Sequence, residues 1–267
     1  MDWRTVGLGL RIGGHRGAAG EAPENTYAGF DLAALAGVDY IEFDVRLLVD
    51  GVAIVIHDEL LDRTTNGHGP VAEATEMTLI RLDAGAWFDP RFAGEPIPTL
   101  AGMLFWLEAH PFLGATIEAK GIGTGAPIAR MIAASPARDR LSVCSFEPDE
   151  LRAAASVDPE VPRLLIADRD APHADPLALA RAALATGINL PWEWCDRLLV
   201  ERLHQAGLIV AGGTADDSDA IRSCMKLDID LVDSNRPALA MSARDASLRA
   251  SRLGRSIDLQ VTDDRPT

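Results

Sequence analysis

The chain has little cysteine, and its few cysteines are not arranged for a disulfide framework or for a thiolate metal site. They are Cys144, Cys195 and Cys224, among 267 residues. Their odd number and wide spacing argue against a disulfide framework, and they show no CxxC or Cys/His pattern of the zinc type. We therefore expect reduced thiols buried in a core.

The chain also lacks long apolar runs. None approaches the roughly 18 residues that a membrane-spanning helix requires. Residues 1–10 lack the basic start and the long apolar run of a secretory signal. We expect a protein without stable membrane insertion and with a cytoplasmic location.

Positive charge is scarce as well. Asp and Glu number 40 against 25 Lys and Arg, which gives a formal net charge of -15. Such a chain repels nucleic acid and anionic lipid at long range, so we expect neither as a partner. A small anionic substrate would require a cation and a few basic side chains to reverse the field inside one cleft. The sequence does not indicate an oligomeric state.

Short apolar runs typical of strands alternate with helical patterns along the chain, which predicts an α/β protein with a parallel sheet. The predicted strands are Arg11–Gly14, Tyr40–Val45, Ala53–Ile56, Thr116–Glu118, Leu141–Ser145, Arg163–Ala167, Ile188–Leu190, Leu208–Ala211 and Ile229–Val232. The predicted helices are Thr26–Ala36, Thr99–Ala109, Pro148–Ala155, Pro176–Ala185, Asp196–Gln205 and Asp217–Lys226.

One predicted strand must run against the others. Only six residues, including Asp50-Gly51, separate Val45 from Val52, which is too few for a crossover helix and typical of a hairpin. Ala53–Ile56 should therefore return antiparallel. The other runs then predict a (β/α)8 barrel, and the length of the chain is usual for that fold.

The whole chain, 1–267, is expected to form one domain. Residues 48–98 contain the hairpin and then turn residues with scattered apolar anchors, which we interpret as a small insertion subdomain over the barrel mouth. Its aromatic residues, Trp87, Phe88 and Phe92, are expected to be buried. Residues 240–267 read as a polar helix and tail.

Three carboxylates are placed for a metal site. Side chains alternate along a strand, so Glu42 and Asp44 share one face, which we expect to point into the barrel. Glu118 lies near the end of the next barrel strand, where the catalytic side chains of such barrels concentrate. Oxygen ligands without a soft ligand suit Mg²⁺ or Ca²⁺. The alternative is a set of salt-bridged acids at a strand edge.

Two histidines and two bases stand near the same strand ends. His15 and His57 each have a charged neighbour, and a pair of imidazoles flanking one bond could deprotonate a nucleophile and protonate a leaving oxygen. Arg16 and Lys120 could supply the positive charge that a phosphodiester needs. Taken singly, such a histidine is more often a hydrogen-bonded structural residue, and such a base is more often solvated or salt-bridged.

A series of motifs follows in a specific order. They are His15-Arg16-Gly17, Pro23-Glu24-Asn25-Thr26, Glu42-Phe43-Asp44, Asp50-Gly51, His57-Asp58, Leu61-Asp62-Arg63-Thr64-Thr65-Asn66-Gly67, Ile97-Pro98-Thr99-Leu100 and Glu118-Ala119-Lys120. Together they closely resemble the glycerophosphodiester phosphodiesterase family. The resemblance is dense over residues 11–120 and continues thinly to Ser145-Phe146 and Asn235-Arg236-Pro237.

This resemblance implies a TIM barrel that hydrolyses small-molecule glycerophosphodiesters to glycerol 3-phosphate and an alcohol with a divalent metal. Carried over by position, it implies the following roles: His15 and His57 as general acid and base, Glu42, Asp44 and Glu118 as metal ligands, and Arg16 and Lys120 as the phosphate clamp. It also suggests attack by the glycerol 2-hydroxyl through a cyclic phosphate. The sequence decides neither that route nor which histidine acts first as base.

Two other functions compete with this one. A related phosphodiesterase acting on lysophospholipids or sugar phosphodiesters would use the same cleft chemistry with a different alcohol pocket. A catalytically silent barrel could retain only phosphate binding. Activity against a substrate panel would distinguish the related phosphodiesterase, and EDTA-sensitive release of glycerol 3-phosphate from glycerophosphocholine would distinguish the silent barrel.

The chain departs from the family pattern at one barrel strand. Family members usually carry a Trp-Thr pair at the end of the seventh barrel strand, whereas here Gly213 precedes Thr214. The preceding strand is followed by Trp192 and Trp194, which would share one face of an extended segment. We expect at least one of them to line the alcohol or glycerol side of the pocket; the alternative is that both pack against the outer helices.

Overall fold

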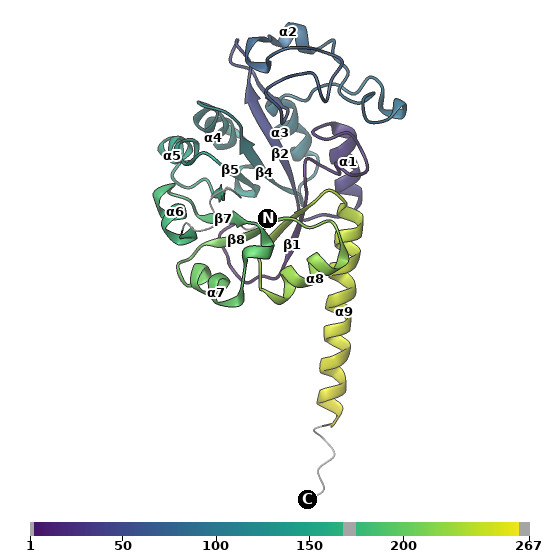
Figure 1. Ribbon diagram of the computed structural model, residues 1–267, viewed down its shortest axis with the longest axis vertical. Helices are drawn as coiled ribbons and strands as arrows, with labels where there is room; N and C mark the ends of the chain where they lie inside the picture. The colour runs from purple at the N-terminus through teal and green to yellow at the C-terminus, as the bar shows by residue number, and fades with distance from the viewer. Residues whose placement is uncertain (1–2, 168–174, 262–267) are drawn as a thin grey trace, which may run out of the picture.

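Eight parallel strands close into a barrel surrounded by helices, as the sequence predicts (Figure 1). The computed structural model describes residues 3–167 and 175–261, with side chains as far as Ser251. The sheet order is β1-β9-β8-β7-β6-β5-β4-β2-β3, and β1 also pairs with β2, which closes the barrel. The strands are β1 Arg11–Gly14, β2 Tyr40–Leu47, β3 Ala53–Val55, β4 Gly114–Ala119, β5 Leu141–Ser145, β6 Arg163–Ile166, β7 Gly187–Leu190, β8 Ile209–Thr214 and β9 Leu231–Ser234.

The hairpin prediction is confirmed, because β3 pairs antiparallel with β2 and takes no part in closing the barrel. Seven of the nine strands differ from the prediction by one to three residues at one or both ends, and β8 and β9 differ most. β8 extends to Thr214 and β9 begins only at Leu231, where the sequence pattern ends the one at Ala211 and begins the other at Ile229. The glycines at the end of β8 hide the strand pattern: Gly212 pairs with Leu190 of β7, but the pairing with β9 shifts register between Gly212 and Thr214.

Helices follow the barrel strands and begin at sequence signals for helix starts. The side chains of Thr26, Thr99 and Asp196 accept hydrogen bonds from backbone N–H groups of the first turns of α1, α3 and α7, as N-cap residues do. The helices are α1 Tyr27–Leu35, α2 Glu76–Leu79, α3 Leu100–Glu108, α4 Gly125–Ala134, α5 Pro148–Val157, α6 Pro176–Ala182, α7 Arg197–Gln205, α8 Ser218–Lys226 and α9 Pro237–Val261.

The sequence pattern does not predict α4, the helix that follows β4. Its first turn contains Gly125 and Pro127, and its N-cap residue, Thr124, makes no side-chain hydrogen bond to the helix, because its hydroxyl donates to the Gly121 carbonyl. Instead, the carboxylate of Glu150, on α5, accepts hydrogen bonds from the N–H groups of Gly123 and Gly125. A Cβ at Gly125 would lie 2.2 Å from the Glu150 carbonyl oxygen, so this close approach requires glycine. A cap supplied by a distant residue leaves no local signal in the sequence.

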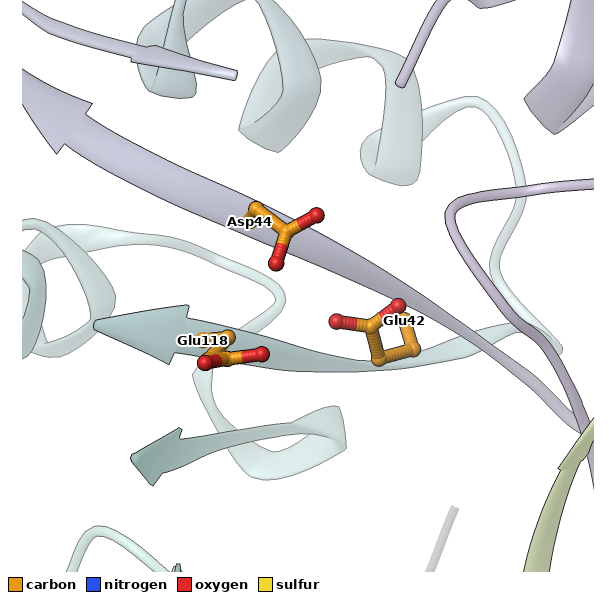
Figure 2. Close-up of side chains that lie close together, drawn as sticks. All are labelled: Glu42, Asp44 and Glu118. Carbon is orange, nitrogen blue, oxygen red and sulfur yellow. The ribbon is translucent and has the colours of Figure 1, made fainter. Parts of the chain in front are cut away.

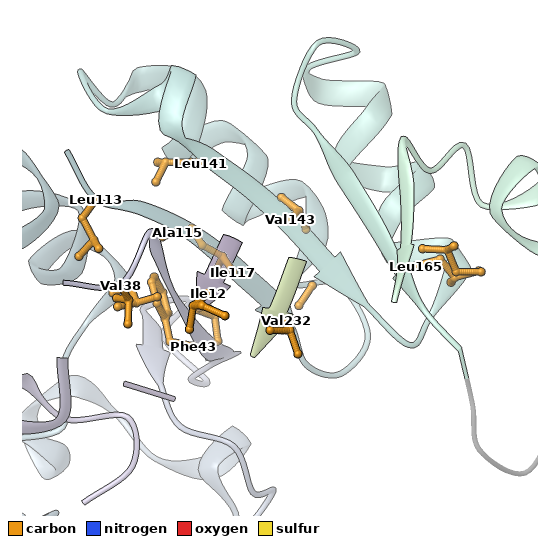
Figure 3. Close-up of a cluster of buried hydrophobic side chains, with 14 of the residues drawn as sticks. Ile12, Val38, Phe43, Leu113, Ala115, Ile117, Leu141, Val143, Leu165 and Val232 are labelled. Atoms are coloured by element: carbon orange, nitrogen blue, oxygen red, sulfur yellow. The ribbon is translucent and has the colours of Figure 1, made fainter. Parts of the chain in front are cut away.

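The main core lies between the barrel wall and the helices. Outward-facing strand side chains such as Ile12, Phe43 and Ile117 pack there (Figure 3). A second cluster fills the end of the barrel at which its strands begin. It consists of Trp3, Tyr40, Cys144, Leu164, Ile209, Ala211 and Leu231, and we call it the barrel floor. The three cysteines are unbridged; Cys144 and Cys224 are buried, whereas Cys195 is half-buried.

Residues 48–98 have a small core of their own, formed by Leu48, Ile54, Ile56, Leu61, Val71 and Leu79. The aromatic residues of this segment are not buried as expected. Trp87 is 39% exposed, and its ring packs edge-on against Phe88, which in turn packs against Phe92. The rings therefore cover one another near the surface.

Helix α9 runs from the barrel wall well beyond it (Figure 1). Near its start, Ala240 and Ala243 are buried in the main core. Arg244 forms an ion pair with Asp39. In residues 3–167 and 175–261, none of the helices combines the length and the apolar character that crossing a membrane demands.

Candidate active site

The carboxyl ends of the barrel strands surround a cavity of about 430 Å³. Parallel strands all end at this mouth, so residues far apart in sequence meet there. His15, Arg16, Glu42, His57, Glu118 and Lys120 all line the cavity, and Asp44 is buried beside them. The structure therefore brings together all the residues that the sequence predicts to bind a metal, to bind phosphate and to transfer protons.

Glu42, Asp44 and Glu118 form one cluster at the mouth. Each offers a carboxylate oxygen, and these atoms lie within 4.8 Å of one another (Figure 2). The pairing of β2 with β4 sets Asp44 opposite Glu118. All three residues are buried, while Phe43 and Ile117 point outward into the main core, as strand alternation requires.

Crowding of the acids perturbs their ionisation. Burial, together with the nearby charge of Asp44, raises the pKa of Glu118 to about 7 and that of Glu42 well above its ordinary value. The pKa of Asp44 is lowered: burial opposes ionisation, but Arg16 and Lys120 outweigh it. A cation among these oxygens would favour the charged form of all three.

Two bases reach into the same cluster. Lys120 Nζ lies 2.8 Å from Glu118 Oε1 and 3.4 Å from Asp44 Oδ1, and Arg16 Nε lies 3.3 Å from Asp44 Oδ2. The backbone of Arg16 has φ 50°, a conformation that non-glycine residues seldom adopt, and its N–H donates to Glu42. Burial opposes the charge on both side chains, but the acids outweigh it and raise the pKa of each.

The two histidines face this cluster, and each is held through Nδ1. His15 Nδ1 lies 2.7 Å from Asn235 Oδ1, and its Nε2 lies 4.0 Å from Glu42. His57 Nδ1 donates to Asp58 at 2.7 Å. Burial lowers the pKa of His57, against the opposing charge of Asp44. In both rings, Nε2 is the nitrogen that remains for proton exchange.

An ionic network that is partly exposed supports His57 and Arg16. Arg63 donates to both oxygens of Asp58 and to both oxygens of Glu24, and Glu24 in turn accepts from Arg16. Glu24, Asp58 and Arg63 belong to motifs of the sequence, but the sequence alone predicts no role for them. The sequence signal that could have identified them is that all three are charged and belong to the same series of motifs as the predicted catalytic residues.

Asn25 is a second residue without a predicted role. Its side-chain amide donates to Asp44 Oδ2 at 2.8 Å, and its own oxygen accepts from the Asp44 backbone N–H. Its backbone has φ 59°, which Asn tolerates better than most residues do. This contact fixes one oxygen of Asp44, which leaves Oδ1 directed at the cluster.

The prediction for Trp192 and Trp194 is wrong in its geometry. The segment Trp192–Trp194 forms a 3-10 turn after Pro191, so the two rings do not share the face of an extended strand. Trp192 packs against the main core, beside Gly212. Of the residues that the structure describes, Leu190, Pro191 and Gly213 line the cavity, but neither tryptophan does.

The carboxylate cluster has the properties of a cation site. Its ligand atoms are all oxygens, as hard divalent cations prefer. Among the described residues, Asp44 Oδ1 is buried without a hydrogen-bond partner, which is costly for a carboxylate oxygen. Glu42, Asp44 and Glu118 therefore fit a divalent metal.

Comparison with known proteins agrees with this site. The model of the glycerophosphoryl diester phosphodiesterase family matches residues 15–239. The chain belongs to this family. YhdW of Bacillus subtilis is 32% identical over 231 residues, which cover 84% of this chain and 93% of that protein. It is one of the relatives that this chain matches over nearly their full length.

Solved structures of the family share the fold. A glycerophosphodiester phosphodiesterase from Agrobacterium tumefaciens is 34% identical, with a TM-score of 0.77 over 87% of this chain and 99% of that one. A phosphodiesterase from Oleispira antarctica, solved in complex with the product sn-glycerol-3-phosphate, is 28% identical, with a TM-score of 0.80 over 88% of this chain and 96% of that one.

Proposed function

We propose that this chain hydrolyses glycerophosphodiesters to glycerol 3-phosphate and an alcohol, with a divalent cation held by Glu42, Asp44 and Glu118. Membership of the family supports the reaction class, phosphoric diester hydrolysis. The observation that carries the proposal is the convergence of three buried carboxylates, two histidines and two bases around one cavity.

The bound cation would neutralise the phosphate and polarise the bond to phosphorus as a Lewis acid. Arg16 and Lys120 border the cavity and carry charge that burial does not remove, so they can bind phosphate oxygens. Asp44 and Glu118 form ion pairs with these two bases. A cation bound to the acids would weaken those ion pairs, so that Arg16 and Lys120 could turn toward the substrate.

His15 and His57 would move the protons. One Nε2 takes the proton of the attacking oxygen as this oxygen forms its bond to phosphorus. The other Nε2 gives a proton to the alcohol oxygen as the bond between phosphorus and that oxygen breaks. Both Nδ1 atoms are already held, by Asn235 and Asp58, which orients each ring. A carboxylate lies beside His57 and an amide beside His15, and the two rings take opposite roles in the two proton transfers.

Release of glycerol 3-phosphate from glycerophosphocholine tests this proposal. We expect turnover with Mg²⁺ or Ca²⁺, loss of turnover on addition of EDTA, and recovery on restoring the cation. The more effective of the two cations identifies the metal. A chain that binds glycerol 3-phosphate but turns over no diester with either cation would be a silent phosphate-binding barrel, and the proposal would be wrong.

A lysophospholipid is the second candidate substrate, favoured by apolar side chains at the mouth. Phe146, after β5, lines the cavity and is 47% exposed, and Ile122, after β4, is 98% exposed. These residues could contact an acyl chain that extends out of the cavity. Comparing kcat/KM for glycerophosphocholine and lysophosphatidylcholine decides between the two substrates.

A further inference from the structure

Three neighbouring strands end in a linked row of polar side chains. β8, β9 and β1 are adjacent in the barrel, and at their carboxyl ends Asp216, Asn235 and His15 follow one another in space. A β-bulge between Gly212 and Thr214 interrupts the pairing of β8 with β9 shortly before Asp216. Such bulges often redirect the side chains that follow them.

Asp216 holds Asn235 at two points. Its Oδ1 accepts from the Asn235 backbone N–H at 2.7 Å and from the Ser234 hydroxyl at 3.1 Å, and its Oδ2 accepts from Asn235 Nδ2 at 2.7 Å. A carboxylate only accepts hydrogen bonds when ionised, so the NH2 end of the Asn235 amide must face Asp216. The oxygen end must then face His15.

This orientation determines which nitrogen of His15 carries hydrogen. Asn235 Oδ1 lies 2.7 Å from His15 Nδ1 and has no hydrogen to donate, so Nδ1 is the donor. In the neutral ring, Nε2 then holds the lone pair, and it lies on the side of Glu42. In the protonated ring Nδ1–H still donates to Asn235, so Nε2 gains and loses the proton in either catalytic role.

We propose that Asp216 is a positioning residue that selects the tautomer of His15 through Asn235. The hydrogen bonds described for its side chain come from Ser234 and Asn235 and not from the proposed metal ligands, and it acts by fixing the direction of one amide. This proposal rests on the proposed function in so far as His15 moves a proton there. Its effect on the ring itself is independent of the substrate.

Isosteric exchanges test the direction of the amide. In Asp216→Asn, Oδ1 can still accept from the backbone and from Ser234, but an NH2 group then faces the NH2 of Asn235. The Asn235 amide must turn round, which places a donor against His15 Nδ1 and moves the hydrogen of the neutral ring to Nε2. We expect kcat to fall about 10- to 100-fold, the usual cost of losing an outer partner of a site.

The exchanged pair, Asp216→Asn with Asn235→Asp, should restore the arrangement. The new amide donates to the new carboxylate, whose other oxygen again accepts from His15 Nδ1. We expect this double variant to recover much of the lost kcat. Asp217→Asn is the matched control, because the Asp217 side chain caps α8 through Asp219 and Ala220 and does not contact Asn235. It should leave kcat unchanged.

The tautomer itself is read from ¹⁵N chemical shifts of labelled histidine rings in the neutral form, with the His15 signal assigned by its absence in His15→Gln. We expect hydrogen on Nδ1 in the wild type, on Nε2 in Asp216→Asn, and on Nδ1 again in the double variant. An unchanged tautomer in Asp216→Asn, or a double variant that stays as impaired as the single one, overturns the proposal. Tautomer shifts without any diesterase activity would instead refute only the proposed function.

Discussion

The two ends of the barrel interior use the same strands for opposite purposes. At the floor, Trp3 packs edge-on against Tyr40 of β2 among apolar neighbours. Two residues further along β2, the mouth begins with Glu42 and then Asp44. The floor buries apolar surface and stabilises the fold, whereas the mouth buries like charges and destabilises it. Stability and chemistry are thus separated along one strand.

Gly13 of β1 allows the Tyr40 ring to lie in the floor, below the mouth. A Cβ at Gly13 would lie 2.3 Å from the Tyr40 ring and 2.6 Å from Asp233 Oδ1, so only glycine lets the ring cross the barrel below the charged layer. Burial, followed by the charge of Asp233, raises the pKa of Tyr40 well above its ordinary value, so the phenol stays neutral. The floor therefore adds no charge beneath the site.

Substitutions at the mouth of the barrel should lower kcat and leave the fold intact. His15→Ala and His57→Ala should each lower kcat on a glycerophosphodiester by about 100-fold or more, since each removes a proton-transfer group. Both side chains lie at the cavity surface, so thermal unfolding should change little. If His57→Ala kept near-native kcat, the two-histidine mechanism would be wrong.

A floor substitution should do the reverse. Trp3 is 2% exposed, so Trp3→Ala leaves a large void and should lower the free energy of unfolding by about 3–5 kcal/mol. At temperatures where the variant stays folded, kcat should match the wild type. Trp87→Ala is the control, because Trp87 is already 39% exposed and should cost less. A large loss of kcat in folded Trp3→Ala would show that floor and mouth are coupled.

Neutralising one acid of the mouth should stabilise the metal-free protein. Because the pKa of Glu118 is raised from its ordinary 4.5 to about 7, the folded state holds a proton there that the unfolded state has released. The free energy of unfolding therefore falls as pH rises through that window. Glu118→Gln should remove this fall and add on the order of 2 kcal/mol at pH 8, with little effect at pH 4.

The same variant should lose the stabilisation that a bound cation gives. Chemical denaturation at pH 4 and pH 8, with and without Mg²⁺ or Ca²⁺, measures both effects. Glu108→Gln, at an exposed position on α3, is the matched control. If Glu118→Gln destabilised the metal-free protein at pH 8, Lys120 would already compensate the acid fully, and the mouth would not be a strained region.

The sequence predicts those parts of the molecule whose causes are local. Strand alternation places Glu42 and Asp44 on one face, and a short Asp50-Gly51 connection reverses β3. The barrel and its mouth follow from repetition of such signals. Local signals do not predict helix α4, because its cap comes from Glu150. They do not predict the link from Asp216 to His15 either, because this link depends on three strands far apart in sequence.

The tryptophans after β7 show how a local rule fails. The alternation argument for Trp192 and Trp194 assumes that the strand continues, but the chain turns at Pro191, and its carbonyl accepts from the Trp194 N–H at 2.9 Å. Residues that follow a strand end can face the mouth or the outer helices with similar sequence patterns. The choice depends on the space beside Gly212, which no neighbour in sequence reveals.

The smallest expected effect concerns these same rings. A Cβ placed on Gly212 would lie 3.2 Å from the Trp192 Cβ, which shows that the tryptophan packs directly against the β8 backbone. Trp192→Ala should therefore lower stability and leave the ratios of kcat/KM among choline, ethanolamine, glycerol and sugar leaving groups unchanged, and Trp194→Ala should do the same with less loss of stability.

Phe146→Ala is the positive control for this measurement. Its ring lines the cavity and lies 5.5 Å from Lys120 Nζ, so its removal should change those ratios by roughly tenfold, the size expected when a pocket wall is lost. A change of that size in Trp192→Ala, with the Phe146 variant unchanged, would mean that the alcohol leaves on the β7 side of the mouth. Since Pro191 and Gly213 line that side, the leaving group would then pass between the ends of β7 and β8.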